Sequence, residues 1–215
     1  SFNPDWVKPV AAEARRLGMG TTGHVPAFGS PDRAIADGYE TIAHINQLML
    51  GWVLKPGEDT RTPLRLTGMA RAAELDLRSA PVRKTVAAMK RSGTALDTTA
   101  MILERLMLSR AGEVAEADAP YLAHMPIGYQ RYRQRSFVDI AGPDEDARYR
   151  RGFDRLVETL GLLHRAGVKL LPGTDDGTGV SVHRELELYV RAGMTPAEAL
   201  RAGTLDAAAY LGQDG

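Results

Sequence analysis

One supersecondary unit recurs along this chain, and it restricts the possible folds more than any other feature. Each copy has an amphipathic helix, a glycine just past the helix end, four to seven β-prone residues, and then a polar residue and a loop. Short strands that alternate with helices are typical of a parallel sheet, because each parallel strand needs a crossover before the next strand begins. The chain is therefore predicted to be an α/β protein with a parallel sheet.

The sequence contains four such units. Asn3, Ser30 and Ser79, each followed within two residues by a proline, mark the starts of the first three helices, and a glycine after the last turn marks the helix ends. The fourth helix is predicted from an apolar stripe with 3.6-residue spacing: Phe153, Leu156, Val157, Leu160 and Leu163. The first helix carries Pro9, so its regular part is expected to begin there. The predicted strands are MGTTGHV (19–25), YETIAHI (39–45), TALDTTAMIL (94–103) and VKLLPGTDDG (168–177). The capping box Thr195-Pro-Ala-Glu198 predicts one of the short helices of the tail.

Two segments, residues 47–78 and 101–150, do not fit the repeat. Both leave from the carboxyl ends of strands, where β/α folds place their sites, so each is either a surface insertion or a lid or specificity loop. The stretch from His124 to Arg151 mixes arginine with tyrosine, but nearby carboxylates offset the charge, which favours a solvated helical cover over a nucleic-acid surface. A further option is that Arg133 clamps a substrate carboxylate.

Composition excludes several classes of partner and site. Lysine plus arginine equal aspartate plus glutamate at 27 each, so no net positive field attracts nucleic acid. The longest apolar stretch, Leu48 to Leu54, is too short for a membrane span. Without cysteine, any metal chemistry must use His, Asp and Glu. The cellular compartment stays undetermined, and we expect any targeting segment to be absent or to lie before Ser1.

Polar residues capable of metal chemistry stand at the ends of three predicted strands: His24, His44 and Asp175. Each has a structural interpretation, as a hydrogen-bonded histidine or an Asx turn. In a β/α barrel, however, the carboxyl ends of all strands meet at one mouth, so the three side chains are expected to converge. Two imidazoles and a carboxylate suit Zn, Mn, Fe or Co, and the carboxylate can accept a proton from a metal-bound water.

Other candidates are weaker. Asp176 is a second choice as base, and His183 is a candidate for orienting the substrate or a metal ligand because it opens a helix soon after Asp175. Ser181 near His183 is not part of a Gly-x-Ser-x-Gly elbow, so a serine hydrolase is disfavoured. The glycine-rich stretch 173–179 lacks the lysine of a phosphate-binding loop.

The residues quoted above resemble those of a known family. Gly-His-Val, Ala-His-Ile and Pro-Gly-Thr-Asp at three strand ends, followed by HRELELYVRAGMTPAEALRAGTLDAAAYLG, resemble the second half of the amidohydrolase superfamily in its imidazolonepropionase-like and prolidase-like branch. The resemblance implies a (β/α)8 TIM-type barrel of which the chain covers about strands five to eight. It also implies that His24 and His44 are metal ligands, and that Asp175 is a ligand and the general base.

The same resemblance shows what these 215 residues do not contain. The family takes further ligands from a His-x-His pair and, in binuclear members, from a carboxylated lysine, and it carries a small β-sandwich. No His-x-His occurs here, and a complete barrel needs about 250 residues. We therefore expect one partial barrel domain over residues 1–215, with insertions at about 47–78 and 101–150. We also expect this fragment to be inactive alone, and its uncovered edges to associate with the missing barrel half or with a second copy.

These arguments predict a metal-dependent hydrolase acting on an amide, cyclic amide or dipeptide-like C–N bond of a small molecule, with one or two divalent ions, Zn first. Asp175 would accept the proton of the attacking water, and His44 would polarise the carbonyl or bind a second metal. The alternative is a non-catalytic β/α half-barrel that binds a ligand or assembles with a partner chain.

Overall fold

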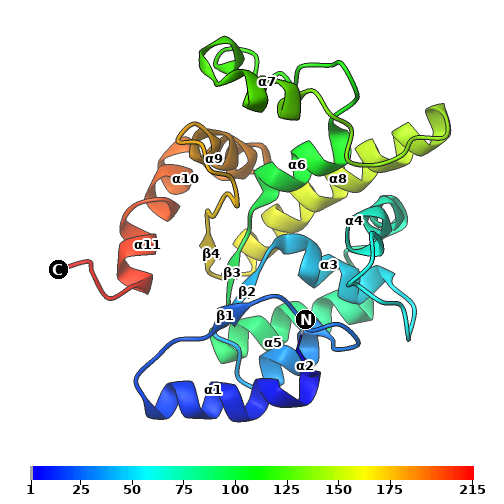
Figure 1. The fold of residues 1–215 in the computed structure, drawn as a ribbon. Coiled ribbons are helices and arrows are strands. Elements are labelled where there is room, and N and C mark those ends of the chain that lie inside the picture. Colours follow the sequence, from blue (N-terminus) through cyan, green and yellow to red (C-terminus); the bar gives the residue numbers. More distant parts are fainter. Residues whose placement is uncertain (1) are drawn as a thin grey trace.

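A sheet of four parallel strands forms the centre of the computed structural model, which describes residues 2–215 (Figure 1). The strands are β1 (Thr22–Gly23), β2 (Thr41–Ala43), β3 (Ala95–Asp97) and β4 (Leu170–Leu171), and they lie side by side in chain order. Thr41 lies opposite Ala95, and Ala43 opposite Asp97. The predicted α/β architecture with a parallel sheet is thus confirmed.

Helices connect the strands and account for most of the remaining structure. In chain order they are η1 (Pro4–Trp6), α1 (Val7–Arg16), α2 (Pro31–Ala36), α3 (Ile45–Val53), α4 (Leu64–Thr67), η2 (Gly68–Glu74), α5 (Ala80–Ser92), α6 (Ala100–Leu108), η3 (Leu122–His124), α7 (Ile127–Arg133), α8 (Pro143–Arg165), α9 (Ser181–Arg191), α10 (Pro196–Ala202) and α11 (Leu205–Tyr210). Among residues 2–215, no helix is both long enough and apolar enough to cross a membrane.

Local sequence signals explain several helix boundaries. The Ser30 hydroxyl accepts the Arg33 amide hydrogen at the start of α2. Gly93 ends α5 with φ of 74°, a left-handed conformation that glycine adopts without strain. Thr195 and Glu198 form the predicted capping box at the start of α10. These boundaries depend on short-range contacts, which explains why the sequence pattern predicts them.

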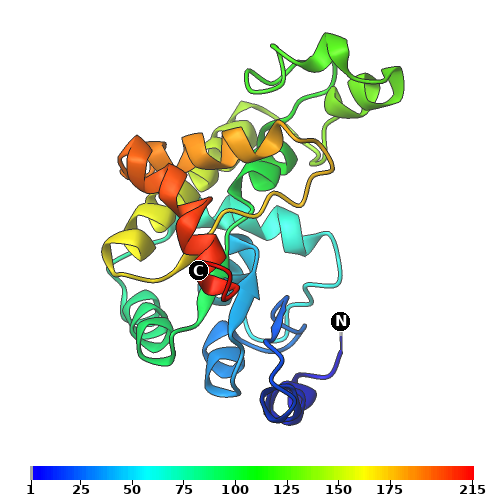
Figure 2. The same ribbon diagram turned by 90° about the vertical axis from the view of Figure 1, so that its left-hand side faces the viewer.

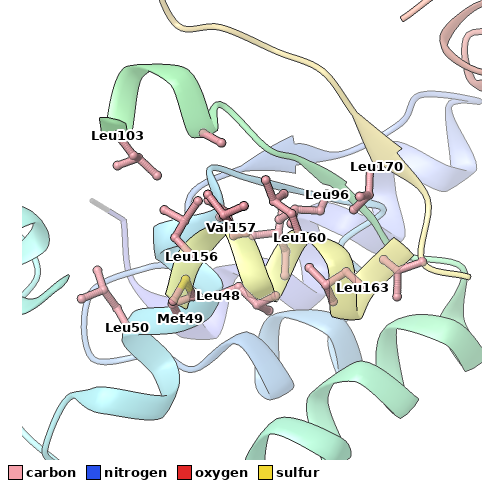
Figure 3. Packing of buried hydrophobic residues seen from close by; sticks show 14 of the residues in the cluster. Leu48, Met49, Leu50, Leu96, Leu103, Leu156, Val157, Leu160, Leu163 and Leu170 are labelled. Atoms are coloured by element: carbon pink, nitrogen blue, oxygen red, sulfur yellow. The ribbon is translucent and has the colours of Figure 1, made fainter. Parts of the chain in front are cut away.

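The apolar core lies between the sheet and the long helix α8. Leu96 of β3 and Leu170 of β4 are adjacent in the sheet register, and both pack with Leu160 and Leu163 of α8 (Figure 3). Leu96, Leu160 and Leu163 are completely buried, so this contact anchors the second half of the sheet. The predicted apolar stripe of residues 153–163 is therefore confirmed as a core face.

The C-terminal helices pass along another side of the sheet. In Figure 2, α11 (red) lies in front of the strands. The Tyr210 hydroxyl of α11 contacts the hydroxyl of Thr41 on β2, and the ammonium of Lys169 lies 5.0 Å from the centre of the Tyr210 ring. The tail of the chain thus covers part of the sheet.

The predicted strand TALDTTAMIL is wrong beyond Asp97. β3 ends at Asp97, and α6 begins at Ala100. The buried carboxylate of Glu185 accepts the amide hydrogens of Ala100 at 3.0 Å and Met101 at 2.7 Å, so it supplies the acceptors that the first turn of α6 lacks. A residue from α9, distant in sequence, therefore ends the strand.

Two other predicted boundaries differ from the structure. The helix expected around 153–163 begins at Pro143, and Tyr149, placed by the sequence in a solvated cover, is only 2 % exposed. The first helix begins at Val7 rather than at Pro9, because proline is tolerated in the first turn, where amide hydrogens have no partner. Within the segment 47–78, α3 continues through Val53, and α4 and η2 follow.

Candidate functional site

The carboxyl edge of the sheet brings together the polar residues that follow the strands. His24 comes directly after β1, His44 directly after β2, Asp97 is the last residue of β3, and Asp175 follows β4 by four positions. Because parallel strands share a direction, their ends meet at the same edge. Asp175 and His44 line the same cavity of about 190 Å³, and the negative charge of Asp175 opposes the lowering of the pKa of both histidines.

The two histidines lie ring to ring. Their ring centres are 4.7 Å apart, with the planes tilted by 43°. His44 Nδ1 lies 2.7 Å from the Thr99 hydroxyl, which leaves Nε2 as its free nitrogen. His24 Nε2 accepts a hydrogen bond of 2.9 Å from the Arg65 guanidinium, so this nitrogen carries no proton.

Desolvation keeps both imidazoles neutral. It is the main cause that lowers the pKa of His24 to about 4, and Arg65 and His44 add to the effect. Burial also lowers the pKa of His44, against the opposing influence of Asp175. Neutral imidazoles can act as metal ligands or hydrogen-bond acceptors near neutral pH.

Backbone strain is concentrated at this edge. Four non-glycine residues within 2–215 have a positive φ, and three of them are His44 at 66°, Thr99 at 46° and Asp175 at 49°. Such conformations are costly and persist only where surrounding contacts impose them. Two backbone hydrogen bonds flank His44: its own amide donates to the Asp97 carbonyl at 2.7 Å, and the Ile45 amide donates to the Thr98 carbonyl at 3.0 Å. The strained turns direct these side chains to the edge.

Asp97 is a site residue that the sequence analysis missed, because it placed this carboxylate in the middle of a strand. Its Oδ1 is buried without a hydrogen-bond partner among the described residues. Burial raises the pKa of Asp97, while the Gly173 amide opposes this shift. Gly173 is required here, since a Cβ at that position would overlap the Asp97 carboxylate.

Arg65, in α4, is the second residue missed, because it belongs to a segment outside the predicted repeat. It lines a cavity of about 190 Å³ together with His44 and Asp175. It also lines a neighbouring cavity of about 510 Å³ that contains His24. Arg65 thus contributes to the walls of both cavities.

A divalent metal fits this edge by ligand type but not by arrangement. Neutral imidazoles and a carboxylate are suitable donors, and a cation, the Arg65 guanidinium, already lies against His24 Nε2. Across residues 2–215, however, no three His, Asp or Glu side chains are grouped closely enough to hold an ion. The described residues therefore supply part of a metal site at most.

Asp176 is held away from this edge. Its carboxylate binds Arg133 at 2.9 Å and Arg105 at 3.2 Å, and Asp118 completes a buried cluster with the same two arginines. Arg133, proposed from the sequence as a substrate clamp in an exposed cover, is only 1 % exposed. The carboxylates it binds are those of the chain itself, because they compensate its buried charge.

His183 lies in the first turn of α9 with an exposed side chain, apart from the ring pair. The structure therefore places His24, His44 and Asp175 at the same edge of the sheet, with only the two histidine rings in contact, and it places Asp176, Arg133 and His183 elsewhere.

Comparisons with known proteins identify relatives of the fold. No family model and no curated protein sequence matches the chain. Among solved structures, it is similar to a bottromycin amidohydrolase at 22 % identity and a TM-score of 0.59, over 96 % of this chain and 44 % of that chain. It is also similar to a Xaa-Pro dipeptidase with methionine bound in its active site, at 17 % identity and a TM-score of 0.55, over 100 % of this chain and 39 % of that chain. The A. niger ochratoxinase matches at 20 % identity and a TM-score of 0.53, over 96 % of this chain and 34 % of that chain.

These neighbours belong to the amidohydrolase superfamily, so the resemblance seen in the sequence is confirmed as a likeness of fold. Each match covers nearly all of this chain, whereas the chain spans less than half the length of each neighbour. A partial barrel is consistent with that coverage.

Proposed function

We propose that this chain is the carboxyl-terminal half of the barrel of a metal-dependent hydrolase that acts on C–N bonds of amides, cyclic amides or dipeptide-like compounds. In this proposal β1 to β4 correspond to barrel strands five to eight. The observation that supports it is that His24 and His44 lie ring to ring at the carboxyl edge of a parallel sheet, with Asp175 lining the same cavity as His44. The amidohydrolase and dipeptidase names of the structural neighbours agree with this reaction class.

His24, His44 and Asp175 would hold the ion, Zn²⁺ first among the candidates, once Arg65 has moved from His24. A bound divalent ion supplies an acidified water and polarises the substrate carbonyl. The further ligands would come from parts of the protein outside these residues.

Asp175 is proposed as the general base: it accepts the proton of the attacking water and delivers it to the leaving nitrogen. His44 is proposed to polarise the carbonyl oxygen through Nε2, because its Nδ1 is occupied by Thr99. Asp176 would contribute indirectly, since its buried ion pairs fix the loop that carries Asp175. His183 is proposed only to orient substrate at the rim.

The alternative of a non-catalytic half-barrel is favoured by one observation, the Arg65 guanidinium at the nitrogen that would bind metal. The hydrolase would bind a metal ion and turn over substrate, whereas the non-catalytic half-barrel would not turn over substrate, so measuring metal content and turnover distinguishes the two.

The test uses the complete gene product, since the chain spans less than half of its neighbours' length. After incubation with Zn²⁺ and dialysis, we expect bound metal by atomic spectroscopy and turnover of a panel of N-acyl amino acids, lactams and dipeptides. Asp175→Asn should lower kcat at least about 100-fold because the general base is lost. Its circular dichroism spectrum should be unchanged, since this exposed side chain contributes little to packing.

Asp139→Asn, which alters another exposed aspartate, is the matched control and should retain full turnover. Metal-free protein without turnover on any compound would favour the non-catalytic alternative. Full activity of Asp175→Asn would remove Asp175 from the role of base.

A further inference from the structure

Arg65 differs from the other interior arginines of this protein. Six further arginines in the described chain are buried or half-buried, and each lies within 4.0 Å of a carboxylate. These are Arg71, Arg105, Arg110, Arg133, Arg155 and Arg184. Arg65 is half-buried but makes no salt bridge with any Asp or Glu of residues 2–215.

A desolvated guanidinium without a counter-ion is unfavourable. Taking a guanidinium partly out of water costs free energy that a paired anion offsets, and Asp175, which lines the same cavity, forms no ion pair with Arg65. Its side-chain hydrogen bond goes to a neutral imidazole nitrogen, and a carboxylate would bind the same fork with two charge-assisted hydrogen bonds. The site therefore favours an anion that the described residues do not provide.

The residues that line the cavity beside Arg65 indicate what kind of anion would fit there. Besides Arg65, His44 and Asp175, its walls are mainly apolar and include Leu66, Ile102 and Leu103. Its volume of about 190 Å³ equals that of roughly six water molecules, at about 30 Å³ each. That is room for a carboxylate and a branched aliphatic side chain.

The charges of the cavity favour one type of anion. Arg65 is its one cationic side chain, and Asp175 contributes a negative charge. A phosphate dianion would therefore be undercompensated, whereas a single planar carboxylate matches one guanidinium. Asp175 and His44, the proposed catalytic residues, line the same cavity, so an anion on Arg65 would lie near the reacting bond.

We propose that Arg65 binds the free carboxylate of the substrate, and that the substrate class is an N-acyl amino acid with an aliphatic side chain. The carboxylate would take the guanidinium from His24, and the side chain would occupy the apolar cavity. This inference rests on the proposed hydrolase function and specifies its substrate.

The test compares two compounds that differ only in charge, N-acetyl-L-leucine and N-acetyl-L-leucinamide, by calorimetric titration of the complete gene product. The acid should bind about 10- to 100-fold more tightly than the amide, as expected for a charge-assisted bidentate pair. Arg65→Gln should remove this preference by weakening the acid while leaving the amide unchanged. Arg65→Lys should keep part of the preference, because lysine retains charge without the fork.

Arg61→Gln is the matched control, since Arg61 lines the neighbouring cavity but already binds Asp59 at 2.8 Å, and it should keep the full preference. Equal binding of acid and amide by the wild type, binding of neither, or an unchanged preference in Arg65→Gln would overturn the proposal. Because the readout is binding, it separates the two proposals: turnover without a preference for the acid refutes only the role of Arg65. A preference for the acid without turnover on any compound refutes only the hydrolase.

Discussion

Glu185 is a single residue of α9 that fixes the geometry of the carboxyl edge of β3. This carboxylate is fully buried, and it binds the Ala100 and Met101 amides and the Thr98 hydroxyl. Burial raises its pKa to about 7, although these hydrogen bonds oppose the shift. Glu185 thereby fixes the turn that separates β3 from α6.

This pKa predicts a pH-dependent stability. Between pH 4.5 and about 7, folded Glu185 holds a proton that the unfolded chain has lost, so the free energy of unfolding should fall as pH rises across that window. The contribution of this residue is about 3 kcal/mol at most. Urea unfolding at several pH values should show that Glu185→Gln lacks this contribution.

Glu187→Gln, on the same helix but with a 61 % exposed side chain, should retain the wild-type pH dependence. If Glu185→Gln and the wild type have parallel pH profiles, Glu185 does not titrate in this window.

Among the elements, the cluster of Arg105, Arg133, Asp118 and Asp176 joins the segment 101–150 to the loop after β4. Its members come from α6, α7 and two loops, and their side chains are all at most 6 % exposed. Buried ion pairs add little net stability, but loss of one partner leaves an uncompensated charge. The segment 101–150 is therefore attached to the loop that carries Asp175 and Asp176.

Arg133→Met should consequently lower the free energy of unfolding by about 3 to 5 kcal/mol, because Asp118 and Asp176 lose a shared partner. Arg131→Met, two positions away and exposed, should change it by less than about 0.5 kcal/mol. Denaturant titration of both variants measures the difference, and equal stabilities would show that the cluster does not hold the segment.

Helix α8 packs closely against the end of α9 at Gly161. A Cβ at Gly161 would overlap the backbone carbonyl of Ala192 at the end of α9. Gly161→Ala should destabilise the protein by about 1 to 3 kcal/mol, despite the better helix propensity of alanine. Gly128→Ala in α7 meets no atom within 4 Å and should be neutral or stabilising by up to about 1 kcal/mol. Thermal unfolding of the two variants tests this, and a more stable Gly161→Ala would contradict the packing.

At the scale of the whole molecule, the sheet has two edges. β1 and β4 each have one neighbour among the described strands, and large apolar side chains such as Leu17, Leu200 and Leu211 are more than half exposed. Open edges and exposed apolar groups both favour association.

We expect the isolated 215-residue chain to associate or to bind a hydrophobic dye, because these surfaces lack a cover. Sedimentation velocity and dye fluorescence measure the two effects. A monomer with cooperative unfolding and no dye binding would show that the chain is self-sufficient.

Elements whose causes are local follow from the sequence pattern alone. The glycine after α5, the capping box before α10 and the apolar stripe of α8 each depend on contacts within a few residues or on a regular period. The parallel strand ends then placed His24, His44 and Asp175 at one edge, because strand direction follows from the β/α alternation.

Features that depend on partners distant in sequence arise when the chain folds and have no local signal. Glu185 ends β3 from 84 or more positions away, so TALDTTAMIL gave no local sign of its break. Arg133 is buried because Asp118 and Asp176 compensate its charge, whereas its own neighbours are those of an exposed helix. Arg65 reaches His24 across 41 positions. Long-range hydrogen bonds and ion pairs have no period along the chain, and for that physical reason they were not predictable from its pattern.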